Sequence, residues 1–331
     1  MDILGIDIGG TKSAVILGQE SADPLIGIKI IDKIAFPTEA IRGPDWTLDQ
    51  IDQAIAGILR RNNCRYDAIR RIGISCGGPL DSRSGRILSP PNLPGWDDVP
   101  IVAWLQERYG VPSRLQNDAN ACALAEWKFG AARGYRNVIF LTFGTGMGAG
   151  LILNGRLYSG ASDMAGEVGH VRLSEHGPVG YGKAGSFEGF CSGGGLAQLA
   201  KSKVLEKLQM GEKVSFCAGP ADLDQISART VAAAADAGDP LAIEIYRISG
   251  ACLGKGLAIL IDILNPEIIV IGSIYCRSRE LLQHTALTEI RREALARAWQ
   301  ACRIEPAALG EQIGDYAALA VALDEEEDNL L

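Results

Sequence analysis

Residues 3–17 read ILGIDIGGTKSAVIL, which predicts two short strands joined by a tight turn at Gly9-Gly10-Thr11. Residues 138–153 read VIFLTFGTGMGAGLIL and repeat this pattern, with a Gly-rich turn at residues 144–148. The two copies align as Asp7 with Thr142, Gly9 with Gly144 and Thr11 with Gly146. Each copy continues into helices and a further strand, so we expect a duplicated mixed α/β unit. The duplication predicts two similar domains with a cleft between them.

The rest of the chain supplies the elements that such a duplication needs. Helical periodicity over residues 46–61 predicts a helix with Thr47 as its N-cap. Residues 77–98 are rich in Gly, Pro and Ser and predict a long functional loop. A long helix over residues 240–264 and a buried strand over residues 268–271 belong to the second copy.

Length and charge limit the class of protein. The chain has 331 residues, a net charge of −8 and a pI of about 5.1, which argues against a nucleic-acid or anionic-membrane partner. The eight cysteines form no Cys-x-x-Cys pair, so we expect buried free thiols in a reducing compartment. No cleavable leader or membrane-spanning run is evident, which predicts a cytoplasmic location.

The two Gly-rich turns fit phosphate binding. Without a Cβ, the backbone N–H groups of such a turn can converge on an anion. Asp7 adds a carboxylate that could hold magnesium through water, and Thr11 and Lys12 add a hydroxyl and an ammonium for the γ-phosphate of ATP. The candidate phosphate-binding residues are Asp7, Gly9, Gly10, Thr11, Lys12, Thr142, Gly144, Thr145 and Gly146. Neither turn matches a Walker A loop, and each alone could be a plain structural hairpin.

Asp118 is the candidate general base. It follows a predicted strand in the segment Asn117-Asp118-Ala119-Asn120, where a carboxylate could take the proton of a sugar hydroxyl during phosphoryl transfer. The alternative is that Asn117 or Asp118 is simply the N-cap of the next helix. Both roles are compatible, because a helix N-terminus keeps a carboxylate ionised.

Glu167 and His170 lie in the segment Gly160–His170, where Gly169 interrupts any helix face. A carboxylate and an imidazole suit the vicinal hydroxyls of a sugar, and Glu188 is a third candidate of this kind. The competing interpretation is structural, since an isolated histidine or glutamate usually has no ligand.

Together these segments resemble the ROK family of sugar kinases and regulators. The two Gly-rich turns are similar to its phosphate motifs, and Ala165–His170 is similar to the family's signature. Gly77-Gly78-Pro79 and Asn92–Trp96 resemble its sugar loops, and Leu264–Gly272 resembles the strand near the adenosine.

The resemblance implies an actin/hexokinase-like (ribonuclease H-like) fold, ATP and Mg²⁺ as cofactors, and a homodimer. It implies a small domain of residues 1–117, joined by a C-terminal helix at about 315–331, and a large domain of residues 118–314. Asp118 would be the general base, and the sugar ligands would be Gly78, Asn92, Asn117, Glu167, His170 and Glu188.

One segment departs from the family pattern. Many members carry a zinc-binding cysteine segment after the signature histidine, whereas this chain has Val179, Tyr181 and Ser186 at those places. His170 alone cannot complete a four-ligand zinc site, so we predict no zinc. Other residues must then hold the Val179–Ser186 loop and position His170 and Glu188.

The leading hypothesis is an ATP-dependent kinase that phosphorylates a hexose, most simply the 6-hydroxyl of glucose. An N-acetylmannosamine or N-acetylglucosamine kinase is the alternative enzyme, because the pocket around the sugar's 2-position is not evident. A sugar-sensing repressor is disfavoured by the acidic charge and by the phosphate turn starting at Asp7, which leaves no room for an N-terminal DNA-binding domain. A non-catalytic sugar binder and a chaperone-type ATPase are weaker candidates.

Overall fold

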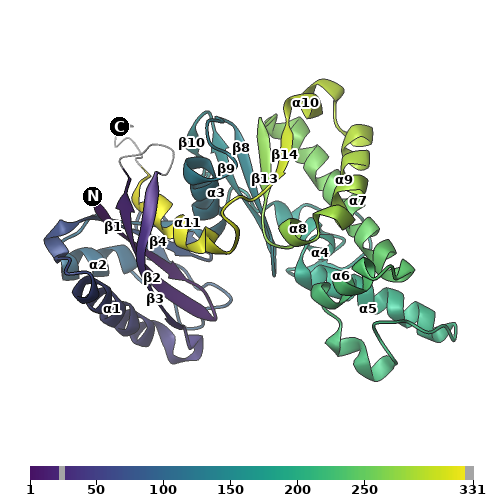
Figure 1. Ribbon diagram of the computed structural model, residues 1–331, viewed down its shortest axis with the longest axis horizontal. Helices are drawn as coiled ribbons and strands as arrows, with labels where there is room; N and C mark the ends of the chain where they lie inside the picture. The colour runs from purple at the N-terminus through teal and green to yellow at the C-terminus, as the bar shows by residue number, and fades with distance from the viewer. Residues whose placement is uncertain (22–26, 325–331) are drawn as a thin grey trace. The chain divides into compact units, whose positions relative to one another are not determined.

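The structure is a computed structural model that describes residues 1–21 and 27–324 (Figure 1). The chain forms two compact units. The first comprises Met1–Arg136, Gly150–Ala165 and Ala308–Leu331, and the second comprises Asn137–Ala149 and Gly166–Ala307. The domain boundary predicted after residue 117 is a different partition and stays a prediction.

A five-stranded mixed sheet forms the centre of the first unit, in the order β3-β2-β1-β4-β7. Strand β1 pairs antiparallel with β2, and parallel with β4, which pairs parallel with β7. The strands are β1 (Asp2–Ile8), β2 (Lys12–Glu20), β3 (Ile28–Pro37), β4 (Ile69–Cys76) and β7 (Ser113–Asn117). A small hairpin, β5 (Leu80–Asp81) and β6 (Arg86–Ile87), follows β4.

Alternation along β1 divides its side chains between two cores. Leu4, Ile6 and Ile8 pack in the larger cluster, which includes buried residues of α1 (Gly43–Arg61) and α2 (Ile101–Tyr109). Ile3 packs instead with Leu319 of α11 (Ile313–Ala322). Figure 1 shows α1 and α11 on opposite faces of this sheet. The sheet is therefore covered on both faces, as a largely buried mixed sheet requires.

The second five-stranded sheet has the order β10-β9-β8-β13-β14. Its strands are β8 (Val138–Phe143), β9 (Met147–Leu153), β10 (Arg156–Leu157), β13 (Ile268–Ile271) and β14 (Arg303–Pro306). Counted along the chain, both sheets have the order third, second, first, fourth, fifth, and in both the last two strands extend the sheet in parallel. The predicted duplication of an α/β unit is confirmed.

The second unit is otherwise mainly helical. Its longest helix, α7 (Pro240–Leu264), packs closely on α9 (Arg279–Glu293). The contact at Gly254 is so close that an added Cβ would lie only 2.4 Å from the Ala286 carbonyl oxygen. The remaining helices and strands of the chain are α3 (Asp118–Phe129), β11 (Val179–Gly180), β12 (Lys183–Ala184), α4 (Phe187–Phe190), α5 (Gly193–Gln209), α6 (Ala228–Asp236), α8 (Ile274–Arg277) and α10 (Ala296–Ala301).

Helix α1 begins earlier than the sequence predicted. It starts at Gly43 with Pro44 in its first turn, and Arg42 is the N-cap. Thr47 lies inside the helix, and its hydroxyl donates back to the Gly43 carbonyl at 3.3 Å. The N-cap prediction for Thr47 was wrong because proline is itself favoured at the first turn of a helix.

Cys76, Cys191 and Cys217 are buried free thiols, but Cys276 is exposed, so the prediction of buried cysteines was only partly right. No helix among residues 1–21 and 27–324 is long and apolar enough to cross a membrane. The C-terminal helix expected at about 315–331 corresponds to α11, which ends at Ala322, and residues 325–331 lie outside the described residues.

Candidate functional site

Three parallel strands of the first unit end at the same edge of the sheet. Ile8 of β1 pairs with Cys76 of β4, and Cys76 pairs with Asn117 of β7. The residues that follow these pairs are the Gly9–Lys12 turn, Gly77-Gly78 and Asp118. Carboxyl ends of parallel strands are the usual position for a ligand site in α/β proteins. The structure thus brings together the candidate residues that the sequence placed in this unit.

The Gly9–Lys12 turn is held by Thr38, a fully buried residue that sequence reasoning missed. The Thr38 hydroxyl donates to the Gly9 carbonyl at 2.6 Å and lies 2.8 Å from the Ser13 hydroxyl, while the Thr38 N–H donates to the Thr11 carbonyl at 3.0 Å. Asn92 packs on the same turn, because a Cβ on Gly10 would lie 2.8 Å from the Asn92 Cβ. The predicted phosphate turn is therefore held in place by these bonds and adjoins the predicted sugar loop.

Asn117 and Asp118 begin helix α3. Asn117 is the N-cap, and its Oδ1 accepts from the Ala119 N–H at 2.9 Å. The Asp118 Oδ1 accepts from the same N–H at 2.8 Å, and the side chain is exposed. A Cβ on Gly78 would lie 3.1 Å from the Asn117 Nδ2, which places Gly78 directly against the cap. Asp118 thus has an accessible carboxylate at a helix N-terminus, as a general base at this position would need.

Asp7 lies in an acidic environment at the end of β1. Burial raises its pKa to about 7, helped by the nearby carboxylates of Asp315 and Asp118, against the opposing charges of Lys33 and Lys12. Asp315 is itself buried and forms an ion pair with Lys33. Several carboxylate groups therefore lie close together in this part of the unit. A divalent cation bound there would reduce the repulsion between them.

The second Gly-rich turn lies between β8 and β9. The Thr142 hydroxyl accepts from the Gly148 N–H at 2.9 Å, and the Gly144 N–H donates to the Gly146 carbonyl at 3.1 Å. The Gly144 carbonyl in turn accepts from the Gly193 N–H at 2.8 Å, at the start of α5. This turn therefore adjoins the N-terminus of a helix of 17 residues.

Glu188, in α4, contacts the second turn directly. Its Oε2 accepts from the Met147 N–H at 3.0 Å, and a Cβ on Gly146 would lie 2.9 Å from the same oxygen. His170 ends a 3-10 turn over Val168–His170, with the exposed Glu167 at its N-cap. A Cβ on Gly169 would lie 3.2 Å from the Glu188 Cβ, so this turn packs against Glu188. The three residues predicted as sugar ligands in the second unit thus belong to one local assembly.

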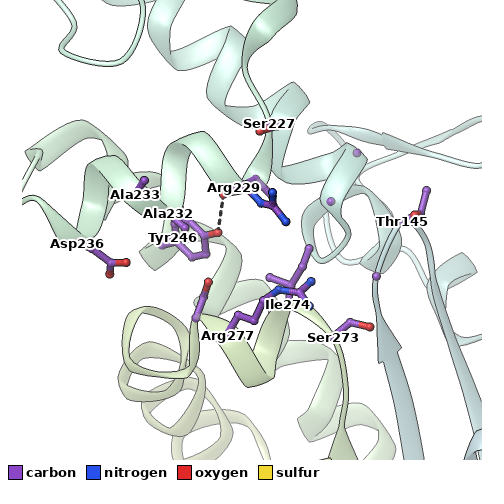
Figure 2. A pocket seen from close by; sticks show the side chains of 15 residues that line it. Thr145, Ser227, Arg229, Ala232, Ala233, Asp236, Tyr246, Ser273, Ile274 and Arg277 are labelled. Carbon is purple, nitrogen blue, oxygen red and sulfur yellow. Dashed lines mark hydrogen bonds between the residues drawn. The ribbon is translucent and has the colours of Figure 1, made fainter. Parts of the chain in front are cut away.

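A pocket of about 750 Å³ lies entirely in the second unit, beside Gly144 and Thr145 (Figure 2). Alanines of α6 and Ile274 supply apolar surface, and the side chains of Arg229 and Arg277 point into the pocket. The Tyr246 hydroxyl donates to the Ala228 carbonyl at 3.0 Å, which fixes part of the wall. The lining residues are Gly144, Thr145, Gly193, Gly194, Ser227, Ala228, Arg229, Ala232, Ala233, Asp236, Tyr246, Ser273, Ile274, Arg277 and Ser278.

This pocket combines the features that a nucleotide requires. Small apolar side chains can contact a flat base, while guanidinium groups and the N-terminus of α5 attract phosphate. Sequence reasoning missed most of its residues. One available signal was Ser192-Gly193-Gly194-Gly195, because Ser192 caps α5 by accepting from the Gly195 N–H at 3.0 Å. No comparable motif marks α6, whose alanines read as ordinary helix.

The predictions of a magnesium contact at Asp7 and of no zinc site are not tested directly by the structure. Among residues 1–21 and 27–324, no group of three or more His, Cys, Asp and Glu side chains is arranged to hold a metal ion. Asp7 remains the candidate contact for magnesium through water.

Comparisons with known proteins extend over nearly the whole chain. The glucokinase of Streptomyces coelicolor is 30% identical over 324 residues, which cover 97% of this chain and 96% of that protein. The crystal structure of a ROK hexokinase from Thermus thermophilus superposes with a TM-score of 0.78 at 30% identity, covering 98% of each chain. A ROK family glucokinase from Streptomyces griseus, in complex with glucose and AMPPNP, gives a TM-score of 0.74 at 28% identity, over 98% of this chain and 99% of that one.

Repressors are also among the relatives. The xylose repressor of Bacillus spizizenii is 27% identical over 324 residues, covering 93% of this chain and 79% of that protein. The model of the ROK family matches residues 3–325. With its hexokinase-like α/β fold and two sheet-containing units, the chain belongs to the ROK family.

Proposed function

We propose that this chain is an ATP-dependent sugar kinase that phosphorylates a hexose, most simply glucose at its 6-hydroxyl. The observation that carries the proposal is the position of Asp118. Its exposed carboxylate lies at the start of α3, beside Asn117 and Gly78, at the sheet edge where the Gly9–Lys12 turn also lies. The proposed base and the proposed phosphate turn thus lie at one edge of one sheet. The glucokinase and hexokinase relatives support the same reaction.

Asp118 accepts the proton of the attacking hydroxyl. The first-turn N–H groups of α3 favour its ionised form, and the bond from the Ala119 N–H orients the carboxylate. The proposed sugar ligands are Gly78, Asn92, Asn117, Glu167, His170 and Glu188. General bases of this kind accelerate a reaction by about 10²–10⁴-fold.

ATP binds with its base and ribose in the pocket of the second unit. Gly144–Gly146 and the N-terminus of α5 contact its phosphates with backbone N–H groups, and Arg229 and Arg277 add positive charge. Gly9, Gly10, Thr11 and Lys12 are the proposed contacts of the γ-phosphate. The complex of the Streptomyces griseus glucokinase with AMPPNP supports ATP as the phosphate donor.

Asp7 would hold magnesium, most simply through water. The residues fit this ion, because the pKa of Asp7 is raised to about 7 by burial and by neighbouring carboxylates, and a cation relieves that repulsion. When bound, the ion would neutralise charge on the phosphate chain.

The experiment that tests this function is ATP-dependent ADP release, with magnesium, across glucose, mannose, fructose, allose, N-acetylglucosamine and N-acetylmannosamine. Turnover on glucose supports the proposal, whereas turnover only on an N-acetylhexosamine supports the alternative kinase. No ADP release with any of these sugars, while sugar binding stays intact, contradicts the proposal and favours the sensor role of the repressor relatives.

A further inference from the structure

The hairpin of β11 and β12 (Val179–Ala184) lies beside two of the proposed sugar ligands. Its two-residue turn is Tyr181-Gly182, and both residues have positive φ, 44° and 76°. Such a turn matches the twist of a hairpin but is costly for a bulky residue. The Tyr181 side chain is also 70% exposed, so burial in a core does not explain this tyrosine.

Two side chains of the hairpin contact His170. The Lys183 ammonium donates to the His170 carbonyl at 2.7 Å. The Tyr181 ring meets the His170 ring edge-on, with centroids 5.1 Å apart and planes at 80°. The hairpin therefore constrains both the main chain and the imidazole of His170.

The backbone of the same hairpin packs on Glu188. A Cβ on Gly180 would lie 2.8 Å from the Glu188 Cβ and 2.7 Å from the Gly189 nitrogen, so only glycine fits there without displacement. Because the Glu188 carboxylate accepts from the Met147 N–H, its position is fixed from both ends. One hairpin thus contacts His170 and Glu188 together.

Gln198 of α5 holds the hairpin from the outside. Its Oε1 accepts from the Val179 N–H at 3.0 Å, and its Nε2 donates to the Val179 carbonyl at 2.9 Å, as a neighbouring strand would. Arg172 adds a bond from Nη1 to the Ala184 carbonyl at 2.9 Å, and the Gly185 N–H donates to the Pro178 carbonyl at 3.0 Å. Ordinary hydrogen bonds therefore hold the hairpin at both of its ends.

We propose that Lys183 and Gln198 are positioning residues for sugar binding. Gln198 holds the hairpin in place through its two bonds to Val179, and Lys183 of the hairpin holds the His170 backbone through its bond to the His170 carbonyl. The inference rests on the proposed function, because it assigns these residues to the sugar ligands of that site. Lys183 acts on the His170 carbonyl, not on the sugar. Its loss should weaken sugar binding and leave ATP binding unchanged.

The first test is steady-state kinetics of Lys183→Met, Lys183→Arg and Gln198→Ala, with Lys213→Met, an exposed lysine of the same unit, as the control. A lost hydrogen bond from a charged donor predicts a rise of about tenfold in the KM for the sugar, with the KM for ATP unchanged. Lys183→Arg, which keeps a charged donor, should recover most of the loss. An unchanged sugar KM in Lys183→Met, or an equal rise in both KM values, overturns the inference.

The second test needs no kinase activity. The chain has three histidines, so the ring signals of His170, His176 and His284 can be resolved by ¹H–¹⁵N NMR of the full-length protein. Lys183→Met should shift or broaden the His170 signal and leave His284, on α9, in place. An unchanged His170 signal refutes the proposal that Lys183 positions His170, even if no sugar is phosphorylated. A shifted His170 signal together with no turnover on any sugar of the panel contradicts the proposed kinase function alone.

Discussion

Thr38 is the residue that holds the Gly9–Lys12 turn through hydrogen bonds to its backbone. Its hydroxyl joins the Gly9 carbonyl and the Ser13 hydroxyl in a fully buried position, and no motif in the sequence marked it. Buried polar partners of a backbone turn are difficult to predict because they follow from strand register, not from local sequence. Here β3 brings Thr38 alongside the turn, since Lys12 pairs with Pro37.

Thr38→Val tests this role. It keeps the shape but removes the hydroxyl, which leaves the Gly9 carbonyl without its buried donor and costs about 1–3 kcal/mol of unfolding free energy. We expect a lower Tm and a higher KM for ATP, measured by thermal unfolding and steady-state kinetics. Thr38→Ser is the matched control and should behave like the unchanged protein. A Thr38→Val variant with normal stability would contradict this role.

A substitution of Arg229 tests the proposed nucleotide pocket. Arg229→Gln removes one guanidinium from the wall and should raise the KM for ATP roughly tenfold, because charge-assisted bonds to phosphate are lost. The KM for the sugar should not change. Arg247→Gln, an exposed arginine on α7 outside the lining residues, is the control. Equal kinetics of the two variants would place ATP elsewhere.

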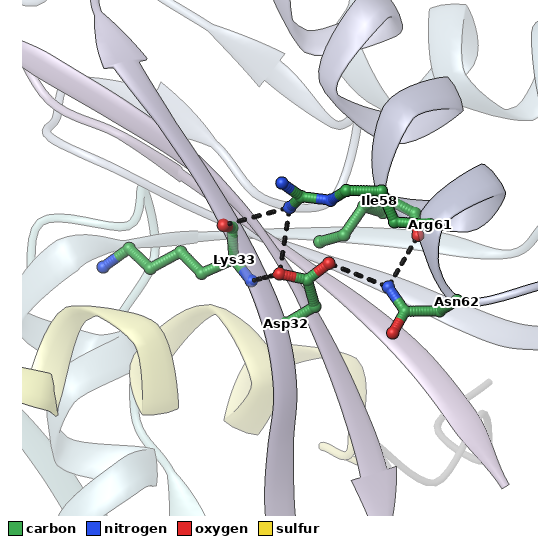
Figure 3. Close-up of polar contacts among 5 residues, drawn as sticks. All are labelled: Asp32, Lys33, Ile58, Arg61 and Asn62. Atoms are coloured by element: carbon green, nitrogen blue, oxygen red, sulfur yellow. Dashed lines mark hydrogen bonds and ion pairs between the residues drawn. The ribbon is translucent and has the colours of Figure 1, made fainter.

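At the scale of elements, the end of α1 is tied to β3 through Asp32 (Figure 3). The Asp32 carboxylate accepts from Arg61 Nη2 at 2.9 Å and from Asn62 Nδ2 at 2.8 Å. Burial would raise the pKa of Asp32, but the bonds from Asn62, the Lys33 N–H and Arg61 outweigh it and leave the pKa below its usual value. The contribution to stability is therefore present above the unfolded pKa of about 3.9 and is lost as pH falls through the lower folded value.

Asp32→Asn should lower the free energy of unfolding by about 1 kcal/mol at pH 7, a small value because the group is partly exposed and screened. At pH 2.5 the difference from the unchanged protein should be smaller than at pH 7. Urea denaturation at both pH values measures it, with Asp49→Asn on the exposed face of α1 as the control. A destabilisation that persists undiminished at pH 2.5 would rule out the carboxylate as its cause.

Helix α11 packs against β4 without intervening side chains. A Cβ on Gly73 would lie 2.1 Å from the Ala318 carbonyl oxygen and 2.3 Å from the Ala322 nitrogen. Gly73→Ala should therefore destabilise the first unit by at least about 1–3 kcal/mol, because helix or strand must move. Gly219→Ala, where the added atom meets nothing within 4 Å, is the control for chemical denaturation. Equal stability of the two variants would disprove the close packing.

How far the sequence predicts these elements depends on the signal each one carries. Helix α7 and strand β13 were predicted with their observed bounds, because long apolar periodicity and a short buried run are unambiguous. The start of α1 was missed since Pro44 and Thr47 compete as start signals. The pocket beside Gly144 and Thr145 was missed at α6, because the alanines of that helix line a pocket only through tertiary packing.

At the scale of the whole molecule, the duplication was the strongest sequence signal and gives each unit one Gly-rich turn. The structure places Asp7, Asn92, Asn117 and Asp118 in the first unit, and Glu167, His170 and Glu188 in the second. The catalytic and sugar-binding roles of these residues remain predictions, as do the homodimer and the absence of zinc. Sedimentation analysis tests the homodimer.

Metal analysis of the purified protein tests the zinc prediction. We expect no zinc, because the resemblance to the family would put cysteines where this chain has Val179, Tyr181 and Ser186, and hydrogen bonds hold the hairpin. Treatment with a zinc chelator, followed by excess magnesium, should leave the Tm and sugar turnover unchanged. One tightly bound zinc per chain would refute this prediction.

The most direct test of the central claim is a comparison of the unchanged protein with Asp118→Asn in glucose-dependent ADP release. The amide keeps the size of the side chain but cannot accept the proton, so we expect kcat to fall by about 10²–10⁴-fold. Glucose binding, followed by titration without ATP, should remain largely intact. Near-normal turnover in Asp118→Asn would contradict the assignment of the base and the mechanism built on it.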